Sequence, residues 1–409
     1  MSNFHAAIHI RDFRLFVMSR LFITLAIHLQ AVVVGWQVYA LTNDPLALGL
    51  IGLAEAIPSI SVALYAGHVA DITDRKKIIQ LCEGALCLCS AALLFFTLPI
   101  GEGFLRQGVW PVYAVIFISG IARGFYSPAA FSFMPQLVHR ELYQNAILWN
   151  TAVWQCAAVC GPMLGGLLYG FFNITAAYLA DLSLMIFGLT CISLVPNRPV
   201  PQKTEEPGVV EKIKAGVRFV FSNQILLAAL SLDLFAVLFG GAVALLPIFA
   251  KDILLVGKTG LGILRAAPAV GAFLTALLII YFPIKKHVGK ILLWCVAGFG
   301  LCMVGFGLST SFALSVFLLA LSGAFDSVSS IVRSMLVHTL TPENMKGRVS
   351  SVNTIFIGSS NEIGAFESGV SAKLIGAVPS VIFGGVMTLG VVAVTAWKAV
   401  KLRVLDRAA

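Results

Sequence analysis

Long apolar stretches recur along this chain of 409 residues and decide what it can fold into. A run of roughly 20 apolar residues is long enough for one helix to cross a bilayer. Only 11% of the residues are charged, against about 25% in an ordinary soluble domain. The chain is therefore expected to be an all-α membrane protein with twelve transmembrane helices. We place these near residues 14–41, 46–70, 77–99, 110–134, 144–170, 173–195, 225–250, 258–282, 290–309, 311–338, 350–373 and 377–402.

The basic residues indicate which side of the membrane each loop occupies. The net charge is +9, and most loop Lys and Arg residues fall on one side of the alternating spans. The other side holds only Arg106, Lys251, Lys258 and Lys373. Basic loops stay in the cytoplasm, so both termini are predicted to be cytoplasmic. Because this bias accounts for the positive net charge, the charge does not indicate nucleic-acid binding. We do not expect nucleic acid as a partner.

The cysteines and the known catalytic motifs give no sign of a cofactor or an enzyme. The eight cysteines all lie in apolar stretches, which argues against a disulfide framework. Cys156 and Cys160 share a helix face, but no His or carboxylate lies at ligand spacing beside them, so no metal site is expected. No phosphate-binding loop or nucleotide domain occurs in the sequence, which argues against ATP as the energy source. We predict a protein that is not an enzyme and needs no cofactor.

A polar segment divides the chain into two parts. Residues 196–224 begin with three prolines, typical of an extended linker, and continue as "VVEKIKAGVRFVF", which predicts a basic amphipathic helix on the membrane surface. Six predicted spans precede this cytoplasmic linker, in residues 1–195, and six follow it, in residues 225–409. The predicted architecture is therefore two six-helix halves.

The two halves repeat each other weakly. "GLAEAIP" at 52–58 matches "GILRAAP" at 262–268, and "SGIARGFYS" at 119–127 matches "SGAFDSVSS" at 322–330. Internal repeats of this kind are typical of secondary transporters, which bind substrate near the bilayer midplane between the repeats.

The segment "GHVADITDRKK" resembles the motif between the second and third helices of the major facilitator superfamily. Gly67, Asp71 and Arg75 match the motif, whereas Ile72 and Asp74 depart from it. The resemblance implies a cytoplasmic gate in which Gly67 permits close helix contact, Asp71 faces a helix N-terminus and Arg75 pairs across the two halves. Ordinary positive-inside charge is the alternative explanation of the basic residues.

The segment "CGPMLGG" in the fifth predicted helix resembles the antiporter motif of exporters in the same superfamily. Gly161, Pro162, Gly165 and Gly166 match it. Glycines at this spacing let two helix backbones approach closely, and the proline bends the helix. The resemblance implies a sealed helix face and the direction of export; a generic small-residue packing face would make the same contacts.

Three further stretches, "ARGFYSPAAFSFMPQLVHRELYQNA", "TPENMKGRVSSVN" and "SNEIGAFESGVSAKLIG", resemble the enterobactin-exporter-like branch of siderophore and drug efflux proteins. This resemblance covers nearly the whole chain. It implies the twelve-helix fold, export from the cytoplasm and exchange for protons. It does not identify the substrate.

Ionisable residues within predicted spans are the candidates for function, because each costs about 2.5–3.5 kcal/mol at the bilayer centre. For proton coupling we select Glu362, Asp326, Asp233 and His28. For substrate binding we select Arg123, Glu55, Gln30, Gln37, Tyr126, Trp154 and Gln155. The alternative for Arg123 is a structural ion pair with a neighbouring helix, and the alternative for His28 is a packing role. Glu367 is predicted to make a structural or outer-gate contact.

Together these observations predict a monomeric carrier in the inner (plasma) membrane that exports a small amphiphilic molecule, siderophore- or drug-like, in exchange for protons by alternating access. The first alternative is an uptake carrier or a lysophospholipid flippase of the same fold. The second is a membrane receptor or assembly factor that retains the fold without transport.

Overall fold

The computed structural model describes residues 6–198, 209–282, 286–342 and 345–406. Within these residues the chain is helical throughout and contains no strand. It forms two compact units, which are described separately below. The first unit consists of residues 1–42, 54–206 and 257–266, and the second of residues 43–53, 207–256 and 267–409.

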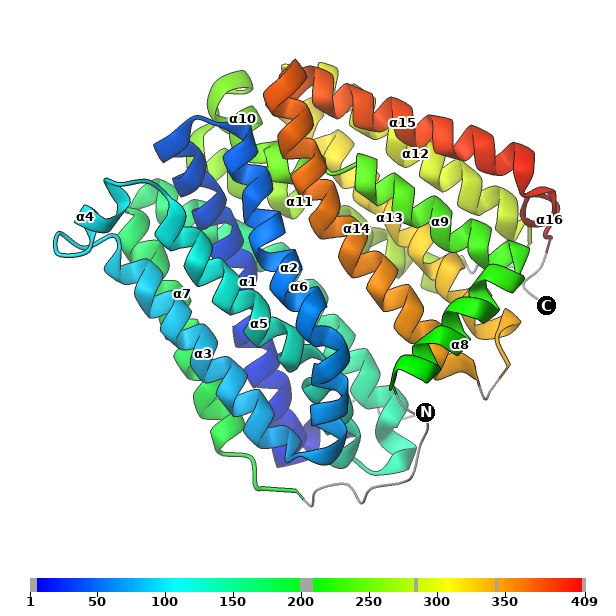
Figure 1. The fold of residues 1–409 in the computed structure, drawn as a ribbon, viewed down its shortest axis with the longest axis horizontal. Coiled ribbons are helices and arrows are strands. Elements are labelled where there is room, and N and C mark those ends of the chain that lie inside the picture. Colours follow the sequence, from blue (N-terminus) through cyan, green and yellow to red (C-terminus); the bar gives the residue numbers. More distant parts are fainter. Residues whose placement is uncertain (1–5, 199–208, 283–285, 343–344, 407–409) are drawn as a thin grey trace. The chain divides into compact units, whose positions relative to one another are not determined.

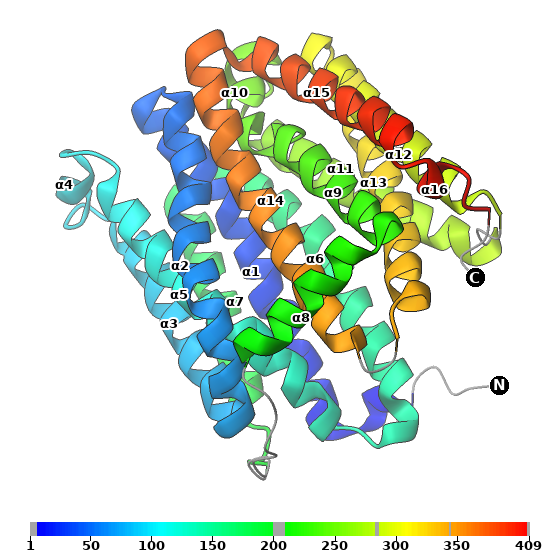
Figure 2. The same ribbon diagram turned by 45° about the vertical axis from the view of Figure 1, so that its right-hand side comes forward.

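The first unit is built from six long helices joined by short turns (Figure 1). These are α1 (Arg11–Thr42), α2 (Pro45–Ile72), α3 (Arg75–Phe95), α5 (Trp110–Phe133), α6 (Tyr143–Phe171) and α7 (Ile174–Ser193). The single turn α4 (Glu102–Leu105) lies between α3 and α5. Helix α1 packs against both α6 and α7, and α3 packs against both α5 and α7 (Figure 2).

The second unit begins with α8 (Val209–Ser222), the amphipathic helix that the linker sequence predicts. Its long helices are α9 (Gln224–Phe239), α11 (Gly257–Tyr281), α12 (Val288–Leu308), α13 (Phe312–Leu340), α14 (Lys346–Ile375) and α15 (Ala377–Lys398), with the short α16 (Val400–Arg403) at the end. Helix α9 continues through short helical turns, including α10 (Leu246–Ile248), to Ile253. Helix α12 packs against α13 and α15, and α14 against α8 and α9 (Figures 1 and 2).

Eleven helical segments in the described part of the chain are long and apolar enough to cross a membrane. Each of the twelve predicted ranges contains a helix, but the range 225–250 is interrupted at Gly240 and Gly241, and α14 does not meet that hydropathy requirement. It carries Glu362, Glu367 and Lys373, together with several Ser and Gly residues. The residues that make α14 interesting for function are thus the ones that lower its apolar character.

Local sequence signals explain where several of these helices begin. Asp74 accepts a hydrogen bond from the Lys76 amide (3.0 Å) and caps α3. Asn173 caps α7 in the same way, and Asn223 caps α9. Short polar side chains at this position satisfy amides that have no partner inside the helix.

Two helices contribute segments to both units. The first residues of α2 belong to the second unit, and the first residues of α11 belong to the first unit. Glycines allow these segments to pack closely. A Cβ added to Gly369 would lie 2.6 Å from the Gly49 Cα, and one added to Gly166 would lie 2.7 Å from the Gly262 Cα. Real Cβ atoms essentially never come this close to another atom, so neither position has room for a side chain.

Candidate functional site

An ion pair joins two of the predicted substrate-binding residues in the first unit. Arg123 on α5 pairs with Glu55 on α2, and both side chains are partly exposed, at 22% and 24%. Glycines bring the two helices together here, because a Cβ added to Gly120 would lie 2.7 Å from the Glu55 carbonyl oxygen. The structural ion pair considered as the alternative for Arg123 is therefore present. Because both side chains are partly exposed, the Arg123 guanidinium and the Glu55 carboxylate are also accessible from solvent.

His28 lies close to Arg123 and to a second arginine. The Arg123 and Arg265 guanidinium groups both act electrostatically on the His28 ring. Arg265, near the start of α11, donates a hydrogen bond to the Ala31 carbonyl of α1 (3.0 Å). The Trp154 indole lies edge-on to His28, with 6.2 Å between ring centroids. The first unit thus gathers two arginines, a histidine and an exposed aromatic ring beside the middle of α1.

The two predicted amides on α1 are buried and paired with α7. The Gln30 side chain donates to an Asp181 carboxylate oxygen (3.3 Å), and the Tyr178 hydroxyl donates to the Gln37 side chain (2.5 Å). Gln30 is 7% exposed and Gln37 is 6% exposed. Buried amides need partners, and these two find them inside the unit. Their pairing accounts for both residues without a substrate.

The remaining predicted substrate residues differ in exposure. Tyr126 is buried on α5, where the Arg20 guanidinium lies 5.7 Å from the centre of its ring. It faces Glu83 of α3, which accepts a hydrogen bond from the Ser19 hydroxyl (2.7 Å). Trp154 on α6 is 47% exposed and Gln155 is partly buried. Of the two, only Trp154 presents a large side chain to an open surface.

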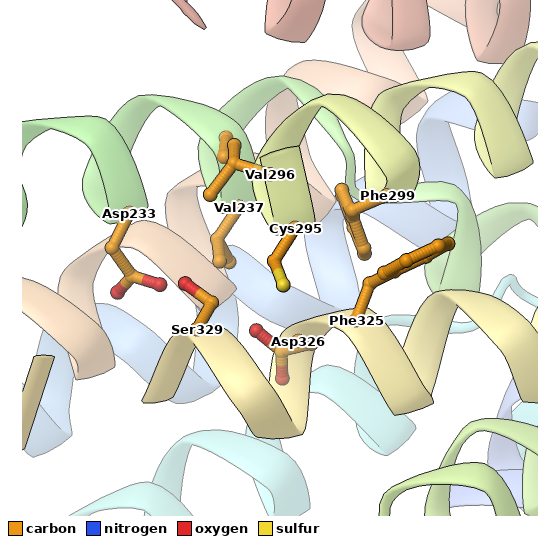
Figure 3. A pocket seen from close by; sticks show the side chains of 9 residues that line it. Asp233, Val237, Cys295, Val296, Phe299, Phe325, Asp326 and Ser329 are labelled. Carbon is orange, nitrogen blue, oxygen red and sulfur yellow. The ribbon is translucent and has the colours of Figure 1, made fainter. Parts of the chain in front are cut away.

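A second group of ionisable residues lines a pocket in the second unit (Figure 3). Asp233 of α9 forms a buried ion pair with Arg333 of α13, and the two side chains are only 7% and 5% exposed. Asp326 of α13 lines the same pocket, with Ser329 beside it and Cys295 opposite on α12. The pocket has room for about one water molecule.

The sequence alone did not predict the partner of Arg333. Arg333 follows Asp326 by seven residues, so the two lie on one face of α13, about two turns apart. Arg333 instead reaches Asp233 on another helix, 100 residues earlier in the sequence. The structure thus brings together two predicted proton-coupling residues, Asp233 and Asp326, and adds Arg333, which pairs with Asp233 and acts electrostatically on Asp326.

The two acids on α14, Glu362 and Glu367, lie on a closely packed helix. A Cβ added to Gly52 of α2 would lie 3.6 Å from an oxygen of the Glu362 carboxylate. A Cβ added to Gly364 would lie 2.8 Å from the Leu238 carbonyl oxygen of α9. Glu362 therefore lies where α14 meets α2, and Gly364 lies where it meets α9. Glu367 is partly buried further along the helix.

The predicted gate motif is only partly visible. Gly67 and Asp71 belong to α2, but their side chains lie outside the described residues. Arg75 donates hydrogen bonds to the Ala70 carbonyl (3.1 Å) and the Ser132 carbonyl (2.8 Å), at the ends of α2 and α5. These contacts lie within the first unit and satisfy carbonyls that a helix end leaves open. A gating role for all three residues stays a prediction.

The glycines of the antiporter-like motif pack against two different helices. Cβ atoms added to Gly161 and Gly165 would lie 2.6 Å from the His28 Cβ and 2.8 Å from the Leu29 carbonyl oxygen, both on α1. Gly166 instead faces the start of α11, as described above. Pro162 lies within α6, which continues past it as a helix. The motif therefore forms two close backbone contacts, one on each side of α6.

Comparison with known proteins decides the family. The profile of the transmembrane secretion effector family matches residues 2–409. The chain belongs to this family of the major facilitator superfamily. It is therefore a multi-pass membrane transporter of the major facilitator type, and the predicted fold class is confirmed.

The transporter is similar to the enterobactin exporter EntS of Escherichia coli O157:H7 (strain EC4115 / EHEC) and to that of Shigella boydii serotype 18 (strain CDC 3083-94 / BS512). Each is 27% identical over 358 residues, which cover 86% of this chain and 83% of the relative.

Solved structures of other superfamily members share its fold. The POT family transporter PepTSo superposes with a TM-score of 0.73 at 12% identity, covering 96% of this chain and 98% of that chain. The D-xylose-proton symporter gives 0.73 at 14% identity, covering 95% and 97%.

Proposed function

We propose that this transporter exports a small amphiphilic molecule, siderophore- or drug-like, from the cytoplasm in exchange for protons. The observation that carries the proposal is the buried Asp233–Arg333 ion pair with Asp326 in the same pocket. Ionisable residues within membrane spans are expensive and are retained for function by default. The curated relatives named as enterobactin exporters support the direction and the substrate class.

In the proposed cycle the second unit takes up the proton. Protonation of Asp233 would remove the attraction that holds Arg333, and Asp326 is the neighbouring acid to which the freed arginine can turn. An ion pair that exchanges partners is a two-state element that proton binding can bias. His28 and Glu362 remain further proton-coupling candidates, His28 beside two arginines and Glu362 at the contact of α14 with α2.

In the first unit, Arg123 and Arg265 would attract an anionic group of the substrate, and Trp154 would contact an apolar or aromatic part. A guanidinium group binds carboxylates and similar planar anions through two hydrogen bonds and also stacks on aromatic rings. Glu55 would neutralise Arg123 when no substrate is bound, which limits the cost of the empty site. The Gln30, Gln37 and Tyr126 side chains would support this site from behind rather than touch the substrate.

The test is transport by membrane vesicles from cells that produce the protein, with a catecholate siderophore and a cationic dye as separate probes. Export by proton exchange predicts that everted membrane vesicles, acidified inside, accumulate the probe and lose it when the pH gradient is collapsed. Accumulation by energised right-side-out vesicles would instead indicate uptake. Movement of lysophospholipid without either probe would indicate a flippase, and full function of variants at every named ionisable residue would indicate a non-transporting role.

The membrane orientation is tested separately. We propose that both termini are cytoplasmic, because the basic loops lie on that side. Alkaline phosphatase fused to the C-terminus is then expected to be inactive and a fluorescent protein at the same position to fluoresce. The opposite result would place the C-terminus outside.

A further inference from the structure

Helix α8 carries a basic stripe that opens onto a hollow in the second unit. Lys214, Arg218 and Ser222 follow one another at four-residue spacing, so they lie on one face of the helix. Together with Ala215, Phe219 and Met345 they line the hollow, which is open to solvent and has a volume of about 650 Å³. A water molecule occupies only about 30 Å³, so the hollow can accept a larger group.

The charge of this hollow is uncompensated within the described part of the chain. Lys214 and Arg218 are both exposed and form no ion pair with a described residue. Among the residues that the structure describes, no acidic side chain lines the hollow. Two cations, a hydroxyl group and two apolar side chains therefore face the same space. This combination suits an anionic group that is attached to an apolar body.

The opposite side of α8 holds the helix in place. Val220 is fully buried in the core of the second unit, and Val217 packs against that core. The Asn223 side chain accepts hydrogen bonds from the Ile225 amide (3.1 Å) and the Leu226 amide (3.2 Å), which ties the end of α8 to the start of α9. Helix α8 also packs against α14 (Figure 1). The basic stripe is thus presented on a fixed surface rather than on a loose linker.

Its place in the chain puts this surface at the edge of the bilayer. Helix α9, which follows α8 after one residue, is part of a membrane span, so α8 lies at the level where that span begins. Phe221 on α8 is 60% exposed, as expected for a side chain at a lipid surface. The cytoplasmic leaflet, on which the linker is predicted to lie, carries anionic lipids that attract Lys and Arg.

We propose that the α8 hollow binds the headgroup of an anionic phospholipid of the cytoplasmic leaflet. Lys214 and Arg218 hold the phosphate, while Ser222, whose hydroxyl donates to the Phe219 carbonyl (2.8 Å), borders the site. Phe219 and Met345 contact the glycerol and the first part of the acyl chains. Since α8 packs on α9 and α14, the bound lipid stabilises the start of both helices. The site is separate from the transport residues and does not depend on the proposed substrate.

The test uses purified full-length protein in detergent, titrated with phosphatidylglycerol or with phosphatidylcholine. Phosphatidylglycerol is expected to raise the thermal unfolding midpoint and to remain bound in native mass spectrometry, whereas phosphatidylcholine does neither at the same concentration. The double variant Lys214→Gln/Arg218→Gln is expected to bind phosphatidylglycerol roughly 30-fold more weakly, which corresponds to about 1 kcal/mol for each basic residue.

The matched control is Lys398→Gln/Lys401→Gln, which removes the same charge from two exposed lysines of the second unit outside the hollow. It should bind phosphatidylglycerol as the unchanged protein does. An equal loss in the control, or no loss in the α8 variant, would overturn the proposal. So would an equal rise of the midpoint with inorganic phosphate alone, because the site would then recognise a free anion and not a lipid.

Discussion

Removing Arg333 is expected to destabilise the protein strongly. The Arg333 and Asp233 side chains are 5% and 7% exposed, so water screens neither charge. Breaking a buried ion pair costs about 3–5 kcal/mol, because the remaining charge has no partner. Arg333→Met also leaves two acids, Asp233 and Asp326, in one pocket without a cation. We therefore expect a loss of about 3–5 kcal/mol in the free energy of unfolding.

Asp233→Leu should cost less, because Arg333 retains Asp326 as an alternative partner in the same pocket. The double variant Asp233→Leu/Arg333→Met removes both charges and fills the space with apolar groups. Such replacements are often neutral or stabilising, so its stability should lie within about 1 kcal/mol of the unchanged protein or above it. The assay is unfolding by increasing SDS in mixed micelles, followed by circular dichroism.

The control is Asp12→Asn, which breaks the more exposed pair of Asp12 with Arg198 (2.5 Å) and should cost less than about 1 kcal/mol. If Arg333→Met also costs less than about 1 kcal/mol, the buried pair is hydrated and the argument from burial is wrong. The double variant separates stability from transport. It should fold but lose the dependence of efflux on the pH gradient. Unchanged coupling in this variant would exclude Asp233 as the proton site.

Three further outcomes are expected. Arg123→Gln and Glu55→Gln should each lower efflux at least 10-fold, with protein amount measured by blotting, because each removes one charge of the Arg123–Glu55 ion pair. Gly161→Leu should destabilise the protein by about 1–3 kcal/mol in the SDS assay, because the new side chain meets α1. Lys373 donates a hydrogen bond to Asp44 (2.6 Å) and lowers the pKa of that loop carboxyl. The pair therefore stabilises the fold above about pH 4, and this contribution is lost as the pH falls further. Because the pair is exposed, Asp44→Asn should cost less than about 1 kcal/mol at pH 7 and flatten the acid limb of the stability profile.

Matched variants check these expectations. Arg123→Lys retains the charge and should retain more efflux than the glutamine variant; equal loss would show that charge is not what matters. Gly84→Leu makes the same change as Gly161→Leu in α3, where a Cβ would meet nothing within 4 Å. It should be nearly neutral. An equal cost at both glycines would show that the contact with α1 is not the cause, and helix propensity cannot account for it because Leu favours a helix more than Gly does.

Part of the candidate site could be predicted from residue types and spacing. Arg123, Asp233 and Asp326 were predicted because charged residues in apolar spans are costly, and each lies in or beside an ion pair or pocket. Gln30 and Gln37 were selected because a polar side chain in an apolar span is also costly. The partner of Gln30 is Asp181 and that of Gln37 is Tyr178, both on a helix more than 100 residues later. Sequence spacing cannot predict such partners, because they depend on the rotation and depth of two packed helices.

The sequence by itself determined the helical spans and the glycine-rich contact faces, because hydropathy and side-chain size act locally, and its charge bias predicts the sides of the loops. It also identified the superfamily through the motifs around Arg75 and Gly161. The tertiary structure alone decided which charges meet: Arg123 with Glu55, and Arg333 with Asp233. In an apolar interior each charge must find its partner on another helix, and only the packing of the helices brings that partner within reach.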